Sequence, residues 1–473
     1  MNQKKMPVYE TLMKFANNKP LSFHVPGHKN GMYFPERGKE YFRDILSIDV
    51  TELTGLDDLH DPSECIAEAQ ELLSNLYGAQ KSYFLVNGST VGNLAMIFTC
   101  CKEGDIVLVQ RNCHKSIMNG LILTGAQPVF LEPWIDEEFG VPVGVPLEDI
   151  KEAIKAHPNT KALILTHPNY YGMGGDLKEI IAFSHKHNIP VLVDEAHGAH
   201  FCLGDPFPLS ALSYGADVVV HSAHKTLPAM TMGSYLHINS QFISSHKIEM
   251  YLSMFQSSSP SYPIMASLDL ARFALVEIKE NGCKDIVKFL NDFRNELHRI
   301  PQIKVLQYKV QDLLKVTIQT RCELSGYELQ HVLEEQGLYA EMADPYNVLL
   351  VMPLKPNQKY MTAVDKMKKA LQNYEVKDRK PVIRYTYKRD FSPVPFTYKQ
   401  LDRCKKSIIS LEKAVGRVCA DMVIPYPPGI PLLMYGEKVT SEHVQRIYEL
   451  QKTGARFQGS IHIQEKNICV YDI

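Results

Sequence analysis

The chain has 473 residues, a formal net charge of −2, and 45% hydrophobic against 22% charged residues. This length leaves room for roughly three domains, and the composition is that of a globular protein with a large core, which excludes a disordered chain. The nearly neutral charge gives no sign of a polyanionic partner such as nucleic acid.

The start of the chain does not read as an export signal, because no apolar segment follows its first two lysines. The longest apolar stretches, such as 189–193 and 217–220, are far shorter than the ~20 residues that span a bilayer. The ten cysteines are scattered and include no Cys-x-x-Cys pair, which favours reduced thiols. We therefore expect a cytoplasmic protein with no membrane and no nucleic-acid partner.

Strands and helices alternate between about residue 80 and residue 240. Apolar, β-branched segments typical of buried strands recur at 81–87, 105–110, 128–132, 161–166, 189–194, 216–221 and 233–238. Helical segments such as 176–187 separate most of them. The pattern predicts an α/β fold with a mostly parallel seven-stranded sheet covered on both faces. Active sites in such sheets lie beyond the carboxyl ends of the strands.

A second pattern begins near residue 265 and predicts a smaller α/β domain. Its expected elements are helices from 265, at 284–298 and at 325–336, and strands at 303–307, 313–318 and 347–352. Residues 354–400 are rich in Lys, Arg, Pro and Tyr, which indicates a linker or a loosely packed connection. A helix at 398–415 and a Pro-rich segment at 425–431 are consistent with a third, small domain.

The first strand, 81–87, ends in Gly88-Ser89-Thr90 ahead of an apolar helix. Free amides at a helix N-terminus and its dipole favour phosphate, and a glycine lets the backbone approach the anion. An ordinary helix N-cap would explain the same residues. The segment matches neither a Walker loop nor the glycine pattern of dinucleotide-binding folds.

Strand 189–194 ends in Asp194, which precedes Glu195, Ala196 and His197. A buried carboxylate needs a partner, and a protonated pyridine nitrogen is one such partner. The alternative is an aspartate that caps the next turn. His197 and His200 lie three residues apart, but no third ligand follows at a recognisable spacing, so we expect no metal.

Strand 216–221 leads into Ser222, His224 and Lys225. A lysine near apolar groups and other cations gives up its proton more readily and becomes a competent Schiff-base nucleophile, although a single lysine is usually only solvated. A phosphate turn, then an acidic residue, then a lysine, at three strand ends of one sheet, is the order in fold-type-I enzymes that use pyridoxal 5′-phosphate (PLP).

The chain resembles the Orn/Lys/Arg decarboxylase family, and most closely its shorter Gram-positive-type members. The resemblance covers nearly the whole length. It rests on FHVPGHKNG (23–31), DVTELTGLDDLHDP (49–62), FLVNGSTVGN (84–93), RNCHKS (111–116), THPNYYG (166–172), VDEAHGAH (193–200), HSAHKT (221–226) and YPPGIPLLMYGE (426–437).

This resemblance implies the aspartate-aminotransferase-like fold of PLP enzymes (fold type I), divided into four regions. The first is an N-terminal arm (1–30), and the second is a large PLP-binding domain (31–265). A small α/β domain (266–375) and a C-terminal α+β domain of the Orn/Lys/Arg decarboxylase type (376–473) follow.

The resemblance also implies roles for single residues. Lys225 is then the Schiff-base lysine, Asp194 pairs with the pyridine nitrogen, and His114 stacks on the cofactor ring. The remaining cofactor contacts are Gly88, Ser89 and Thr90 on one side of the phosphate, Ser222 and His224 on its other side, Ala196 beneath the ring, and His197. Many relatives carry Gly-Thr-Ser in the phosphate turn, and Gly88-Ser89-Thr90 keeps both hydroxyls.

The implied reaction is PLP-dependent decarboxylation of a basic amino acid in polyamine metabolism. Arginine or lysine is expected in preference to ornithine, giving agmatine, cadaverine or putrescine and CO2. Two alternatives stay open: an aminotransferase or other lyase on the same fold, and a catalytically silent PLP-binding protein. His114 favours a decarboxylase, because aminotransferases commonly stack an aromatic ring at that place.

The resemblance further implies at least a homodimer whose sites form across a two-fold interface. The FHVPGHK segment, with His24, Pro26, His28 and Lys29, is then expected near the substrate entrance. A buried cationic substrate group needs a carboxylate partner. The candidates are Asp57, Asp58, Asp61 and Glu437.

Overall fold

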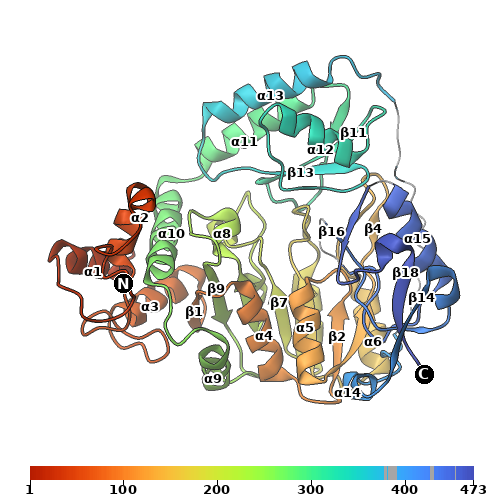
Figure 1. Cartoon of the computed structure of the whole chain (residues 1–473), viewed down its shortest axis with the longest axis horizontal. Coiled ribbons are helices and arrows are strands. Elements are labelled where there is room, and N and C mark those ends of the chain that lie inside the picture. The colour runs from red at the N-terminus through yellow and green to blue at the C-terminus, as the bar shows by residue number, and fades with distance from the viewer. Residues whose placement is uncertain (378–380, 382–390, 427–430, 453) are drawn as a thin grey trace. The chain divides into compact units, whose positions relative to one another are not determined.

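Seven strands form the central sheet of the computed structural model, which describes residues 1–377, 381, 391–426, 431–452 and 454–473 (Figure 1). The sheet order is β1-β9-β8-β7-β6-β2-β3. The strands are β1 (Lys81–Leu85), β2 (Ile106–Gln110), β3 (Gln127–Leu131), β6 (Ala162–Thr166), β7 (Val191–Asp194), β8 (Val218–His221) and β9 (Ser234–Ile238). Each falls within a predicted strand segment or within one residue of it.

The direction of the strands confirms the predicted, mostly parallel sheet. β9 runs antiparallel to both β1 and β8, whereas β2 is parallel to β3 and β6, and β7 is parallel to β8. Every residue of β7, β8 and β9 is buried. Valine and other branched residues suit strands that are covered on both faces, which is why these segments read as continuous apolar runs.

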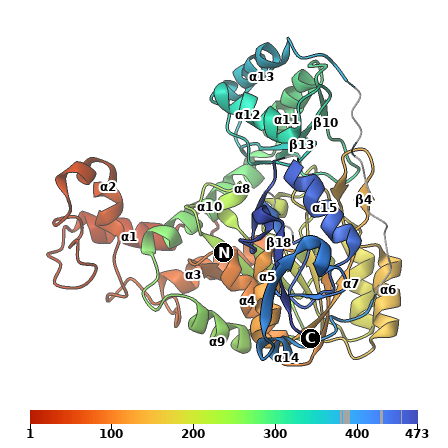
Figure 2. The ribbon, with the colours of Figure 1, turned by 45° about the vertical axis from the view of Figure 1, so that its right-hand side comes forward.

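The chain divides into two units, of which the first comprises Met1–Cys100 and Pro190–Cys283. Helices α1, α2 and α3 lie beside α10 in this unit, as Figures 1 and 2 show. α4 packs against β1, β8 and β9, while α3 and α10 pack against β1. The helices of this unit are α1 (Pro7–Asn17), α2 (Glu36–Ile48), α3 (Cys65–Tyr77), α4 (Ser89–Cys100), α8 (Ala223–Thr226), α9 (Ser245–Phe255) and α10 (Tyr262–Asn281).

A buried ion pair on α10 holds the first residues of the chain. Arg272 Nη1 donates to the carbonyl oxygen of Gln3 at 2.8 Å, and Asp269 Oδ2 accepts from the Val8 amide at 3.0 Å. Asp269 and Arg272 are both fully buried and pair with each other at 3.2 Å. Burial raises the pKa of Asp269 to about 6, in spite of the adjacent guanidinium. The chain start is therefore an ordered part of this unit.

The second unit comprises Cys101–Ile189 and Lys284–Ile473. Its smaller four-stranded sheet has the order β10-β11-β13-β12 and is antiparallel throughout. The strands, close to the predicted segments, are β10 (Ile303–Val305), β11 (Lys315–Thr320), β12 (Met342–Ala343) and β13 (Asn347–Val351). Outside the two sheets, the helices and strands of this unit that precede β13 in the chain are α5 (Lys115–Thr124), β4 (Ile135–Asp136), β5 (Val141–Pro142), α6 (Leu147–Ala156), α7 (Leu177–Lys186), α11 (Lys284–Leu297) and α12 (Gly326–Glu335).

The prediction of a loose connection over 354–400 was wrong for α13 (Gln358–Leu371). This helix buries Val364, Met367 and Leu371, which recur at helical spacing among lysines. The many charges belong to its solvated face and masked the apolar stripe. Residues 378–380 and 382–390 of the predicted connection lie outside the described residues.

The prediction of one helix at 398–415 was also wrong. α14 (Tyr398–Asp402) ends after five residues, and β14 (Lys406–Ser410) then pairs antiparallel with β18 (Asn467–Tyr471). The β-branched pair Ile408-Ile409 suits a strand better than a helix interior. The remaining elements are β15 (Val418–Cys419), β16 (Ile424–Tyr426), α15 (Ser441–Lys452) and β17 (Arg456–Gln458).

Two further predictions concern the Pro-rich segment and the lack of a membrane-spanning segment. Residues 427–430 of the predicted Pro-rich segment lie outside it. Among the helices that are described, none combines the length and the apolar character that crossing a membrane requires.

Candidate active site

The predicted phosphate turn lies between β1 and α4, at the carboxyl end of β1. Gly88 has a φ of +81°, which a glycine adopts without strain, and α4 begins at Ser89. Ser222 Oγ, which follows β8, donates to Ser89 Oγ at 2.7 Å. The resemblance implied that the hydroxyls of Ser89 and Ser222 contact a phosphate from two sides. In the structure they are hydrogen-bonded to each other beside the N-terminus of a twelve-residue helix.

Asp194 is the last residue of β7 and is 3% exposed. Asn93 Nδ2 donates to Asp194 Oδ2 at 2.9 Å, and the Ala196 amide donates to Oδ1 at 3.2 Å. Both donors are neutral, so they orient the carboxylate without cancelling its charge. The carboxylate is thus suited to hold a proton on a cationic ring nitrogen.

Sequence reasoning missed Asn93, which lies one helical turn after Ser89 and is 1% exposed. The signal was a single amide side chain among Val91, Leu94 and Ile97 in an apolar helix. A buried amide needs partners, so its position pointed to a polar group on a neighbouring strand.

Lys225 and His224 lie in α8, directly after β8. Lys225 Nζ is 3.1 Å from His197 Nε2. His224 Nδ1 is 3.0 Å from the carbonyl oxygen of Gly233, and since a carbonyl only accepts, Nδ1 carries the proton. Its Nε2 can then donate to an anion only as the imidazolium, the form that a phosphate would favour.

Backbone hydrogen bonds join the segment of Asp194 to the segment of Lys225. The Glu195 amide donates to the Val220 carbonyl at 2.9 Å, and the Ser222 amide donates to the Ala196 carbonyl at 3.2 Å. The phosphate turn, Asp194 and Lys225 are therefore brought together within one unit of the fold. Of the other predicted contacts in this unit, His197 and Ser222 are buried, Ala196 is half-buried and Thr90 is exposed.

A row of hydrogen-bonded, buried polar side chains crosses the strands that carry the phosphate turn, Asp194 and Lys225. Glu195 Oε2 lies 2.7 Å from His221 Nε2, and His221 Nδ1 lies 3.1 Å from His237 Nε2. His237 Nδ1 continues to Ser82 Oγ at 2.7 Å. Burial, and then the neighbouring His221, keep the pKa of His237 well below its usual value. This row of hydrogen-bonded side chains could not be predicted from the sequence, because its members come from four strands or strand ends.

His114 belongs to the second unit and is the N-cap of α5. Its Nδ1 accepts from the Ser116 amide at 3.3 Å and lies 2.9 Å from Ser116 Oγ, and the residue is exposed. An exposed imidazole held at one nitrogen presents its ring for stacking. Its predicted place over the cofactor ring stays a prediction.

Of the four candidate carboxylates for the substrate, Asp57 and Glu437 already have several structural partners. Asp57 accepts from the adjacent Asp58 amide and from four amides around the start of α3, which are those of Ser63, Glu64, Ile66 and Ala67. Burial disfavours its charge, but these hydrogen bonds outweigh burial and hold the pKa of Asp57 below its usual value. Asp58 accepts only a local bond, from the His60 amide at 2.8 Å, among the hydrogen bonds of the described residues.

Glu437 forms a bidentate pair with Arg111 of the same unit, at 2.7 and 2.8 Å. Arg111 Nε also lies 3.4 Å from Glu132, directly after β3. Burial raises the pKa of Glu132, whereas the guanidinium overcomes burial at Glu437 and holds that pKa below its usual value. The pair links the end of β2 to the C-terminal part of the chain.

The FHVPGHK segment is fixed by polar contacts within itself and with two later residues of the chain. His28 Nδ1 accepts from the Gly31 amide at 3.1 Å, so the proton is on Nε2, which lies 3.1 Å from Asp49 Oδ2. Lys29 Nζ donates to the carbonyl oxygen of His24 at 2.5 Å. These contacts define the shape of the segment, and its predicted place at a substrate entrance stays a prediction.

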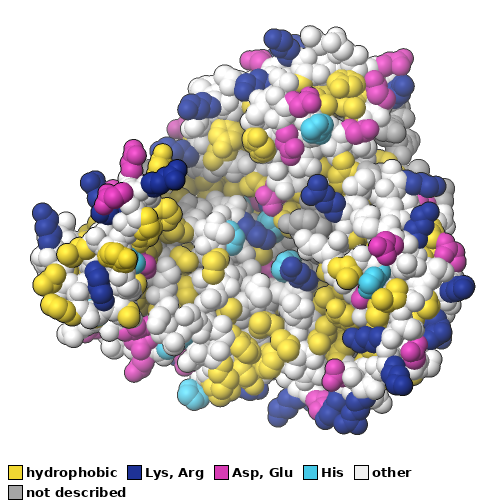
Figure 3. All heavy atoms as spheres, in the orientation of Figure 1, with side chains coloured by type: hydrophobic (Ala, Val, Ile, Leu, Met, Phe, Trp, Pro, Cys, Tyr) yellow, Lys and Arg dark blue, Asp and Glu magenta, His cyan; other side chains and the backbone are white. Residues whose placement is uncertain are grey.

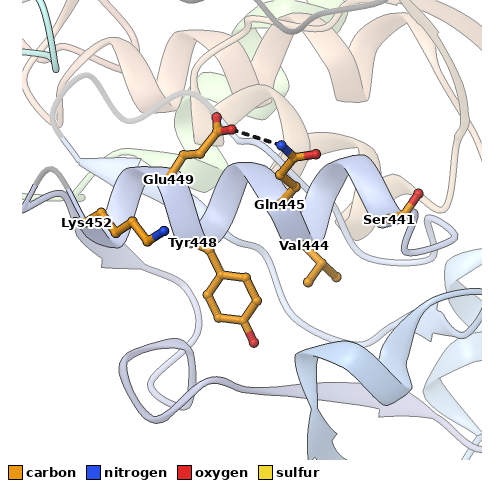
Figure 4. Close-up of a pocket in the computed structure, with 6 residues that line it drawn as sticks. All are labelled: Ser441, Val444, Gln445, Tyr448, Glu449 and Lys452. Atoms are coloured by element: carbon orange, nitrogen blue, oxygen red, sulfur yellow. Dashed lines mark hydrogen bonds between the residues drawn. The ribbon is translucent and has the colours of Figure 1, made fainter.

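Two hollows occur away from these groups. One, of about 400 Å³ in the first unit, lies along β1 and includes Asp61, His60 and Tyr83 in its lining. The other, of about 460 Å³, lies along α15 (Figure 4). One helix supplies its whole lining, in which Gln445 Nε2 donates to Glu449 Oε1 at 3.2 Å, so it is a surface feature. Within the described residues, no group of three His, Cys, Asp or Glu side chains is placed to hold a metal ion.

Two family models match the chain. The one described as "Orn/Lys/Arg decarboxylase, major domain" matches residues 6–322, and "Orn/Lys/Arg decarboxylase, C-terminal domain" matches residues 387–461. An arginine decarboxylase of Bacillus subtilis is 33% identical over 97% of this chain and 96% of its own length. The protein YaaO of the same organism, described as uncharacterized, is 48% identical over 98% of both chains.

Solved structures show the same fold. The lysine decarboxylase LdcF of Francisella novicida has a TM-score of 0.83, at 19% identity, over 98% of this chain and 80% of that chain. Serine palmitoyltransferase of Sphingomonas wittichii has a TM-score of 0.55, at 16% identity, over 78% of this chain and 86% of that chain. At these identities the likeness concerns the fold alone.

Proposed function

Because the chain belongs to the Orn/Lys/Arg decarboxylase family, we propose that it binds PLP through Lys225 and removes the α-carboxylate of arginine or lysine. One observation carries the proposal. The phosphate turn, the carboxylate of Asp194 and the amine of Lys225 lie together at the carboxyl ends of β1, β7 and β8.

The charges and hydrogen-bonding groups of these residues suit the proposed cofactor. The N-terminus of α4, with Gly88 and Ser89, faces Ser222, and together these groups offer amides and hydroxyls to a phosphate. Thr90 and His224 complete the proposed phosphate site. When bound, PLP supplies an electron sink for the bond that breaks at Cα.

The chain's own groups then have distinct tasks. Asp194, oriented by Asn93, holds a proton on the ring nitrogen. Lys225 provides the amine that carries the cofactor and that yields to the substrate amine. His114 is proposed to stack on one ring face, while the small Ala196 leaves room at the other. The reaction that results places the protein in the formation of amines from basic amino acids, as in polyamine metabolism.

The proposed substrate class rests on the relatives. The proposed binding group for its cationic end rests on which carboxylates have few hydrogen-bond partners. The matching family is described by ornithine, lysine and arginine, and the relative named above is an arginine decarboxylase. Asp57 and Glu437 are already held by backbone amides and by Arg111. We therefore propose Asp58 and Asp61 as the first candidates to bind the cationic end of the substrate. Because Asp61 lines a hollow away from the cofactor groups of its own chain, it would serve the site of the neighbouring subunit in the proposed dimer.

The test of the proposed function is product analysis with purified protein and PLP. We expect CO2 and the matching amine in equal amounts from arginine or lysine, less from ornithine and little from neutral amino acids. No keto acid is needed. Transfer of the amino group to a keto acid without CO2 would replace this proposal by an aminotransferase. Cofactor binding without any turnover would favour a silent PLP-binding protein.

The N-terminal region supports the proposed homodimer. Its exposed hydrophobic side chains gather on and before α2, as the yellow surface of that region shows (Figure 3). They are Leu21, Phe23, Val25, Met32, Tyr33, Tyr41, Phe42 and Ile45. Phe23 is 88% exposed and Tyr41 81%. Exposed apolar groups this numerous in one region are typical of an interaction surface.

We predict that the protein sediments as a dimer or larger assembly at assay concentration. The double variant Phe23→Asp with Tyr41→Asp is expected to shift the equilibrium toward monomer and to lower activity with it, because charges at an apolar interface disfavour association. Tyr339→Asp is the matched control, since Tyr339 is 83% exposed and belongs to the other unit. A fully active monomer would contradict the prediction.

A further inference from the structure

His197 contacts the reactive atom of Lys225. Its Nε2 lies 3.1 Å from Lys225 Nζ, and the imidazole is only 6% exposed. Such a contact needs one lone pair and one proton between the two nitrogens. Either an ammonium donates to a neutral imidazole, or the imidazole donates to a neutral amine. The pair is therefore able to pass a proton between two defined atoms.

The turn that carries His197 is closely packed. The Gly198 amide donates to the Glu195 carbonyl at 2.8 Å. A Cβ at Gly198 would lie 2.5 Å from Glu195 Cγ and 2.8 Å from the ring of Phe201, so only glycine fits there. His197 thus sits on a turn that cannot shift without moving Glu195.

Glu195 in turn is anchored on both sides. Its Oε2 accepts from Ser210 Oγ at 2.5 Å and lies 2.7 Å from His221 Nε2, and its Oε1 accepts from the Ala211 amide at 2.8 Å. His221 is the last residue of β8 and immediately precedes the segment of Lys225. The same fully buried couple therefore fixes both the turn of His197 and the start of the lysine segment. The distance between His197 and Lys225 is set by this framework.

We propose that His197 is the proton acceptor for Lys225. Its Nε2 takes one proton from the Nζ ammonium, so an N–H bond breaks at Nζ and another forms at Nε2, and the imidazole becomes imidazolium. The amine lone pair is then available for covalent attachment to the cofactor. When Lys225 is released again, the same proton returns from Nε2 to Nζ. This inference rests on the proposed function and deepens it, because it assigns a catalytic task to His197 beyond cofactor contact.

An imidazole suits this task because its ordinary pKa, about 6.5, lies near the working pH, whereas a free lysine keeps its proton up to about 10.4. A group near neutrality can both take up and return a proton. The ionisable groups on the adjoining segments are Asp194 and Glu195 after β7, and His221 and His224 around the end of β8. They stay unchanged when only His197 is replaced.

The experiment follows covalent capture of PLP by the full-length protein after its cofactor has been removed. PLP is added, borohydride stops the reaction at set times, and mass spectrometry quantifies the label on the Lys225 peptide. Glutamine at position 197 keeps hydrogen-bonding atoms but takes up no proton. We expect His197→Gln to slow labelling at least about tenfold at about pH 7, and the gap to narrow at about pH 9.5, where hydroxide replaces the imidazole.

His200→Gln is the matched control, because His200 lies in the same segment but packs against Phe201 and Phe207, with ring centroids 4.8 and 5.0 Å away. It is expected to label at the wild-type rate in its folded fraction. Wild-type labelling of His197→Gln at about pH 7 would overturn the inference. Equal slowing at both pH values would do so too, because it would leave His197 only a positioning role. Uptake of label by Lys225→Ala at the wild-type rate would instead refute the proposed cofactor site.

Discussion

Lys225→Ala is expected to abolish turnover and to remove the visible absorbance that borohydride eliminates in the wild-type protein. The variant retains the phosphate turn and Asp194, so PLP can still enter, but no amine at position 225 can carry it. Because proton transfer by a positioned side chain alone contributes about 10²–10⁴-fold, and the covalent attachment is lost as well, we expect kcat to fall by at least about 10³-fold. The measurements are decarboxylation kinetics, the absorbance spectrum, and mapping of the reduced label to a peptide.

Lys81→Ala provides the control for removing a lysine from the same unit. Lys81 begins β1 and forms an ion pair with Glu249 at the surface. Surface pairs contribute roughly 0–1 kcal/mol, so this variant should keep its spectrum and its turnover. A Lys225→Ala protein that still carries the reducible band would show that another lysine holds the cofactor.

Asp194→Asn is expected to leave PLP bound while turnover falls by about 10²-fold or more. The amide fits the space and can still bond to Asn93, but it provides no negative charge to hold a proton on the ring nitrogen. A neutral pyridine is a poor electron sink, so the loss should appear in kcat rather than in cofactor affinity. Cofactor titration and steady-state kinetics, measured on the same preparation, separate the two effects.

The matched control is Asp217→Asn at the amino end of β8. Asp217 is 1% exposed, and its carboxylate accepts from the Val191 amide at 2.7 Å. The same change of a buried carboxylate to an amide there should lower stability without a specific loss of kcat in the folded fraction. Near-normal turnover of Asp194→Asn would mean that the charge of the ring is set by another group.

The central sheet could be predicted because each of its strands carries its own signal. Strands such as β8 are buried on both faces, so most of their residues are apolar and often branched, as in the three valines before His221, and short runs of this kind are distinctive. The two errors arose where the local signal was mixed. The lysines of α13 hid a narrow apolar stripe, and the segment after α14 was assigned by helical continuity although β14 is completed by the distant β18.

The parts of the candidate site that directly follow a strand could be predicted, because each of those strands has its own local signal. Lys225, Asp194 and the phosphate turn each follow a recognisable strand, so sequence order alone indicated their meeting. Asn93 contacts Asp194 across the sheet, and such a contact depends on strand order and not on spacing along the chain. His197 was named as a cofactor contact, but its distance of 3.1 Å from Lys225 depends on strand order in the same way. Asp57 was offered as a substrate group because a carboxylate in a loop shows no sign of the five amides that bind it.

The pair of Arg111 and Glu437 has a consequence for how this chain could be recombined with its relatives. The two residues are 326 positions apart, yet each is the main ionic partner of the other. A chimera that took its last hundred residues from another protein would inherit a half-buried guanidinium from one parent and its counter-ion from the other. Such an exchange is compatible with folding only if both parents carry the same pair, so positions 111 and 437 must be transferred together.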